Sequence, residues 1–223
     1  MKPEERRFLK DPDEFVVWTT RLAAWAQQHR TTLVAAGAGV FALALVGGVM
    51  SWRAARQAEA ASAGFQLAHG KFAARDYAPA ALEFETVARE YASTSFGRLA
   101  VLYRGHALLQ SGDAAGAAAA YQDFLARFDE DAALEQLAQT NLAYAQEQLG
   151  DTASARTTAE RAAERSGPYR VEALLTYARL SEAAGDTAAA QDAYRKVLAE
   201  NPDAQTRTFV QSRLPDGGEP PAG

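Results

Sequence analysis

Residues 105–121, GHALLQSGDAAGAAAAY, decide the fold of this chain. The stretch begins with the small residue Gly105, has a Gly-Asp pair at Gly112 and Asp113, and ends with the aromatic residue Tyr121. A Gly-Asp pair between two apolar segments is a turn signal. Alanine and leucine favour helices, and the alternation of β-branched residues that marks strands is nearly absent. The stretch therefore predicts two helices joined by a short turn.

The same pattern occurs four times along the chain. The turns fall at Arg75-Asp76, Gly112-Asp113, Gly150-Asp151 and Gly185-Asp186, with aspartates 37, 38 and 35 residues apart. This spacing is near the period of helix-turn-helix repeats. Small residues lie seven positions before and five after each turn's first residue, and an aromatic follows four positions later in three units. They are Ala68, Gly105, Ala143 and Ala178, then Ala80, Ala117, Ala155 and Ala190, then Phe84, Tyr121 and Tyr194, with Ala159 in the third unit.

From Phe65 to Pro202 the pattern resembles the tetratricopeptide repeat family. The resemblance implies that the small residues lie where two antiparallel helices cross and that the aromatic packs between successive units. The chain departs from the family where Lys71, Gln146 and Ser181 replace a large residue late in the first helix. These departures leave the exact helix boundaries open, but not the architecture.

The resemblance and the composition together predict an all-α fold. One helix pair cannot bury its apolar face alone, so at least three must stack. We expect a solenoid of about four helix pairs within a repeat domain of residues 53–214. Residues 205–214 are expected to form a capping helix, and residues 215–223 a disordered tail, because Pro and Gly dominate them.

A second prediction concerns residues 31–52, which carry no charge. Their length matches the roughly 20 residues needed to cross a bilayer, and Trp52 and Arg53 suit its edge. The alternatives are a buried helix of a soluble domain and a cleaved signal peptide, but about 30 mostly polar residues before the apolar core disfavour the latter. We expect a single transmembrane helix, with the N-terminus in the cytoplasm because basic residues are more frequent in the leading tail.

The leading tail, residues 1–30, contains a further helix signal. Asp11 and Pro12 suit a helix start. An aromatic stripe then follows at helical spacing, formed by Phe15, Trp18, Leu22, Trp25 and His29. The stripe predicts an amphipathic helix that lies on the bilayer surface, or alternatively one that docks on a partner protein.

Composition and motifs disfavour several classes of function. Net charge is -5, so the basic footprint of a nucleic-acid binder is missing. The chain has no cysteine, which excludes disulfides, thiolate zinc sites and cysteine nucleophiles. No catalytic or phosphate-binding motif occurs. His69 and His106 occupy equivalent positions, but Tyr144 and Arg179 follow in the next units, so groove lining is favoured over a shared metal. We expect neither an enzyme nor a cofactor.

In the tetratricopeptide family the first helices of the units line a groove that binds partner segments. By position, the resemblance implies a mixed groove, more apolar in the first two units, and without the lysines that form the family's basic clamp around the position of Asn141. The groove would contain Phe65, His69, Phe72, Leu102, His106, Leu109, Thr140, Tyr144, Glu147, Leu175, Arg179 and Glu182.

The order of tail, span and repeats resembles the YfgM-like family of bacterial inner-membrane proteins ancillary to the SecYEG translocon. This resemblance implies a membrane-anchored interaction module with a periplasmic repeat domain. Its partners would be translocon components, periplasmic chaperones or client chains. The alternative is a scaffold subunit of an envelope complex in cell division or outer-membrane assembly.

Overall fold

A computed structural model describes residues 12–128 and 131–215. Within these residues the chain forms ten α-helices and no strand, which confirms the all-α prediction. The chain divides into two compact units, residues 1–56 and 57–223.

The first unit contains α1 (Pro12–Gln28) and most of the apolar part of α2 (Arg30–Ala73). Regular helix is interrupted at His29. α2 has 44 residues, and among the described residues it is the one helix long and apolar enough to cross a membrane, with none of its apolar window buried. The helix cap predicted at Asp11 and most of the predicted C-terminal tail lie outside the described residues.

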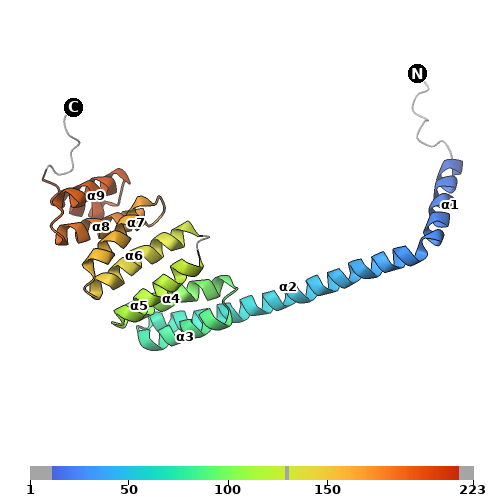
Figure 1. The fold of residues 1–223 in the computed structure, drawn as a ribbon, viewed down its shortest axis with the longest axis horizontal. Helices are drawn as coiled ribbons and strands as arrows, with labels where there is room; N and C mark the ends of the chain where they lie inside the picture. Colours follow the sequence, from blue (N-terminus) through green and yellow to red (C-terminus); the bar gives the residue numbers. More distant parts are fainter. Residues whose placement is uncertain (1–11, 129–130, 216–223) are drawn as a thin grey trace, which may run out of the picture. The chain divides into compact units, whose positions relative to one another are not determined.

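The second unit is a stack of antiparallel helix pairs (Figure 1). The end of α2 pairs with α3 (Tyr77–Glu90), α4 (Ser95–Gln110) with α5 (Ala114–Arg127), α6 (Ala132–Gln148) with α7 (Thr152–Glu164), and α8 (Arg170–Ala183) with α9 (Thr187–Ala199). The final helix α10 (Ala204–Arg213) buries Val210 against the last pair. Four pairs and a capping helix are the architecture that the repeat pattern predicts.

Three of the four turns use a Gly-Asp pair to end one helix and begin the next. At the second turn Gly112 has a φ of 87°, which glycine adopts without a side-chain clash. The Asp113 amide donates to the carbonyl of Leu108, and its carboxylate accepts a 2.8 Å hydrogen bond from the Gly116 amide. Asp113 therefore satisfies orphan groups of both helices. The first turn differs, because Arg75 holds the left-handed position at a φ of 62°.

Small and aromatic residues form the core where the helices cross. A Cβ atom added to Gly105 would lie 2.6 Å from the ring of Tyr121, so this glycine makes room for the ring. Phe84, Tyr121 and Tyr194 are each at most 1% exposed. Burying one such ring stabilises the fold by about 1.5–3 kcal/mol. The resemblance implies that these aromatics pack between successive units. In the structure their rings are buried.

Candidate protein-binding surface

The first helices of the four units, which are the end of α2, α4, α6 and α8, present one continuous row of side chains. We call this row the first-helix face. Six positions before each turn stand His69, His106, Tyr144 and Arg179. Three of them contact the residue nine positions before the next turn. The ring centroids of His69 and Tyr103 are 5.9 Å apart, the Asn141 amide lies 3.1 Å from His106 Nε2, and Tyr144 Oη lies 2.9 Å from Thr176 Oγ1.

This recurring contact joins each unit to the next at the face itself. A side chain fixed by such a contact loses little further rotamer freedom when a partner binds, which favours affinity. The first-helix face is therefore preorganised by the same pairs that hold the solenoid together.

Tyr103 is the centre of an aromatic cluster in the first two units. Its ring centroid lies 5.1 Å from that of Phe65 and 5.3 Å from that of His106, both edge-on, and 6.4 Å from that of Phe72. Edge-to-face pairs of this kind each contribute about 0.5–1.5 kcal/mol beyond area burial. His69 is exposed, whereas Phe72 and Tyr103 are half-buried. The cluster thus leaves part of its aromatic surface exposed to solvent, supported by close ring contacts beneath.

His106 is held neutral inside this cluster. Burial lowers its pKa from 6.5 to about 4. The ring also lies 5.7 Å from that of Tyr121, whose own pKa is raised by burial. With a neutral ring, Nε2 can accept the hydrogen bond from Asn141, provided that the proton resides on Nδ1. His106 therefore links α4 to α6 as a neutral hydrogen-bond acceptor.

The last two units present charges that are already paired. The Arg179 guanidinium binds both carboxylate oxygens of Glu147 and lies 5.7 Å over the Tyr144 ring. The hydrogen bond from Arg179 lowers the pKa of Glu147. Glu182 accepts a 3.0 Å hydrogen bond from Tyr194 and lies 3.7 Å from Arg213. This part of the face is polar but carries little unpaired charge.

The structure removes two of the predicted groove residues from the face. Leu102 is 1% exposed and Thr140 is fully buried. Both stand ten positions before their turns, where the side chain points between neighbouring helices rather than outward. Phe65 occupies the equivalent position and is only 9% exposed. Leu175, the fourth member, is half-buried.

Sequence reasoning also missed Tyr103, which is one residue further along. The sequence did offer a signal for Tyr103: it is an aromatic residue where the other units have Gln66, Asn141 and Thr176. Leu109, another predicted groove residue, is half-buried and packs against the core of the second and third units.

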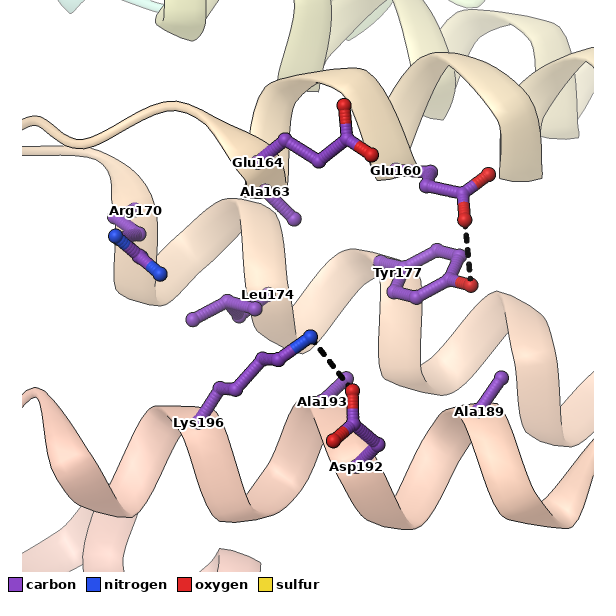
Figure 2. A pocket seen from close by; sticks show the side chains of 10 residues that line it. All are labelled: Glu160, Ala163, Glu164, Arg170, Leu174, Tyr177, Ala189, Asp192, Ala193 and Lys196. Atoms are coloured by element: carbon purple, nitrogen blue, oxygen red, sulfur yellow. Dashed lines mark hydrogen bonds and ion pairs between the residues drawn. The ribbon is translucent and has the colours of Figure 1, made fainter.

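A separate pocket of about 360 Å³ lies between α7, α8 and α9. Figure 2 shows two bound pairs among its side chains: Tyr177 Oη lies 3.1 Å from Glu160, and Lys196 Nζ lies 2.6 Å from Asp192. Arg170 lies 3.1 Å from Glu200. Both basic side chains that line the pocket are thus paired with carboxylates, so neither is free to bind an anionic ligand.

The comparisons with known proteins agree with this architecture. Residues 23–214 match the family described as the tetratricopeptide repeat-like domain, so the chain belongs to that family. It is similar to a crystal structure of the MamA protein, with 16% identity, a TM-score of 0.57, and coverage of 72% of this chain and 84% of that one. It is also similar to PilF of Pseudomonas aeruginosa, with 16% identity, a TM-score of 0.58, and coverage of 71% and 69%. At this identity both show a shared fold. No curated protein is significantly similar in sequence.

Proposed function

We propose that this protein is a non-enzymatic, membrane-anchored interaction module that binds segments of other proteins on its first-helix face. The observation that carries the proposal is that α2 contains both the unburied apolar segment and part of the repeat core. Its apolar window is entirely unburied, yet the same helix ends with Ala61, Phe65 and Ala68 buried in the repeat core. One continuous helix thus supplies both the proposed membrane anchor and the first helix of the repeat domain. Confinement to a membrane raises the effective concentration of such a domain near membrane-bound partners.

The chemistry of the face indicates what it binds. Aromatic side chains on a rigid base are the residues that most often dominate binding energy at protein interfaces. His69, Phe72 and Tyr103 offer such a base, whereas the Glu147–Arg179 pair further along is neutral as a unit. We infer that the partner places an apolar or aromatic segment against the first two units and polar groups against the last two. A partner's acidic chain end is disfavoured as the bound segment, because the face lacks the lysines of the family's basic clamp.

The order of segments along the chain supports a cellular location and a pathway for this module. The resemblance to the YfgM-like family favours protein translocation or periplasmic chaperone traffic at the bacterial inner membrane. In that setting the N-terminus is cytoplasmic and the repeats are periplasmic. The partners are translocon components, chaperones or emerging client chains. Reporters fused to the C-terminus that are active only in the periplasm or only in the cytoplasm test the topology, and cytoplasmic activity alone would reverse it.

Site-specific photo-crosslinking in intact membranes tests the binding face. We would place the crosslinking amino acid at His69, which is exposed on the face, and as a matched control at Gln122, which is exposed on the second helix α5. We expect a defined protein adduct from position 69 that position 122 does not give. Mass spectrometry should identify it as a translocon component, a chaperone or a translocating chain. Equal adducts at both positions would contradict the assignment of the face. A cell-division or outer-membrane assembly protein would instead support the scaffold role.

A further inference from the structure

The helix α1 carries an apolar stripe that no described residue of its own unit covers. Trp18, Leu22 and Trp25 lie on one side of the helix at spacings of four and three residues. Their side chains are 61%, 47% and 51% exposed. The ring of His29 extends the stripe, 5.1 Å from that of Trp25. Two exposed tryptophans within two helical turns are unusual on a water-facing surface and indicate that something covers them.

The side of α1 opposite the stripe is more polar. Gln27 is exposed there, and Arg21 flanks the stripe. The helix is therefore amphipathic, with a narrow aromatic side and a wider side of mostly polar or small residues that also carries Val17, which is 45% exposed. Such a helix binds along a surface rather than inserting across a bilayer.

The position of α1 in the chain identifies the surface. Only His29 separates α1 from α2, whose charge-free segment begins at Thr31. Once that segment spans a bilayer, the interface is within reach of every residue of α1. The tether removes most of the entropic cost of a second contact with the same membrane. Tryptophan, like tyrosine, is enriched in the headgroup region of membranes.

We propose that α1 lies in the bilayer interface, on the side where the N-terminus emerges, with Trp18, Leu22 and Trp25 buried among the lipids. This inference rests on the membrane anchor of the proposed function. The sequence of residues 1–30 has six basic and five acidic side chains, so attraction to anionic lipid contributes little. Burial of the aromatic stripe drives the contact, and zwitterionic lipid is sufficient.

The distribution of tryptophan makes the test direct. The chain has three tryptophans, of which Trp18 and Trp25 belong to α1 and Trp52 to the apolar helix α2. Full-length variants that keep one tryptophan, with the other two changed to phenylalanine, would be reconstituted in phosphatidylcholine vesicles. Lipids with a nitroxide quencher near the headgroup or deep in the acyl chain then report the depth of each residue. A fourth variant carries Gln27→Trp with all three native tryptophans replaced, as the control for the opposite side.

We expect the shallow quencher to reduce the fluorescence of Trp18 and Trp25 by about half or more, and the deep quencher to act less. The tryptophan at position 27 should lose less than half as much. If Trp52 is quenched while Trp18 and Trp25 are not, the anchor stands and the proposal for α1 is overturned. This is the result expected if a protein or a second copy of the chain, rather than lipid, covered the stripe. Quenching of position 27 equal to that of Trp18 also overturns it. If Trp18 and Trp25 are quenched but Trp52 is not, α1 binds lipid and the anchor of the proposed function fails instead.

Discussion

The side-chain amide of Gln136 on α6 donates a 3.0 Å hydrogen bond to the carbonyl oxygen of Ala162 near the end of α7. The same Nε2 donates to the carbonyl of Arg165 at 2.9 Å, and Oε1 accepts from the amide of Tyr169 at 3.2 Å. Gln136 is fully buried. One side chain therefore satisfies three backbone groups of the segment that connects the third unit to the fourth.

Replacing Gln136 with alanine should destabilise the protein strongly. The variant removes one hydrogen bond to the buried Ala162 carbonyl and two part-buried ones to Arg165 and Tyr169, each worth about 0.5–1.5 kcal/mol. Allowing for water that enters the space, we expect the free energy of unfolding to fall by about 2–4 kcal/mol. Chemical denaturation followed by far-UV circular dichroism measures it. Gln148→Ala, at an exposed position of the same helix, is the matched control and should change stability by less than about 0.5 kcal/mol.

Two turn aspartates that are alike in sequence should respond differently to substitution. The Asp113 carboxylate accepts a hydrogen bond from Gly116, whereas the structure records no side-chain capping bond for Asp76. Asp113→Ala should therefore lower the free energy of unfolding by about 1 kcal/mol, and Asp76→Ala by clearly less. Equal losses measured by denaturation would show that these aspartates do not act through their capping bonds.

The same turns show how much of the fold could be predicted from the sequence. Gly112, Gly150 and Gly185 mark three turns in the sequence, because the turn needs a residue in the left-handed conformation, which glycine favours. The aspartate that follows each glycine marks the start of the next helix. Arg75 at the first turn could be assigned only by its distance from the other three. Gln136 gave no such signal. A glutamine in a helix reads as a surface residue, and its burial depends on a connecting segment about 30 residues further along the chain.

Arg75→Gly should stabilise the protein. Arginine in the left-handed conformation costs about 1–2 kcal/mol, and the greater freedom of glycine in the unfolded chain offsets about 0.5–1 kcal/mol of that gain. We expect a net rise in the free energy of unfolding of up to about 1.5 kcal/mol. The neighbouring change Ala74→Gly is the control, because position 74 does not have a positive φ and gains nothing. An Arg75→Gly variant no more stable than the control would mean that the arginine conformation carries no strain.

Two tyrosines at equivalent repeat positions should also differ. Among the described residues, the buried hydroxyl of Tyr121 has no hydrogen-bond partner, whereas the Tyr194 hydroxyl donates to Glu182 at 3.0 Å. Tyr121→Phe removes an unsatisfied polar group, so stability should stay unchanged or rise by about 1 kcal/mol. Tyr194→Phe removes a bond to a carboxylate and should cost about 1–2 kcal/mol. Thermal unfolding of the two variants side by side checks the sign, and a loss at Tyr121 would indicate a partner such as bound water.

The residues of the first-helix face were less predictable than the fold for a geometric reason. Positions along a helix differ by about 100° in direction, so a shift of one residue moves a side chain from the face into the core. This shift explains why Leu102 is buried and Tyr103 lies on the face. The contact of His106 with Asn141 could not be read from either residue, because it depends on how closely two units stack.

The burial of His106 predicts a loss of stability in mild acid. In the unfolded chain this histidine binds a proton below about pH 6.5, but in the folded protein its pKa is lowered to about 4. Between these values the unfolded state binds more protons, so stability rises with pH and is lost as the pH falls. The contribution is nearly complete at pH 7, and about 2 kcal/mol of it is lost between pH 7 and pH 5. His106→Gln keeps an acceptor for the Asn141 amide but does not titrate, so its unfolding free energy should change less over this interval. Most carboxylates stay ionised above pH 5, which leaves the difference between the two curves to His106. Parallel curves for the original and the variant protein would show that His106 is as easily protonated in the folded protein as in the unfolded chain.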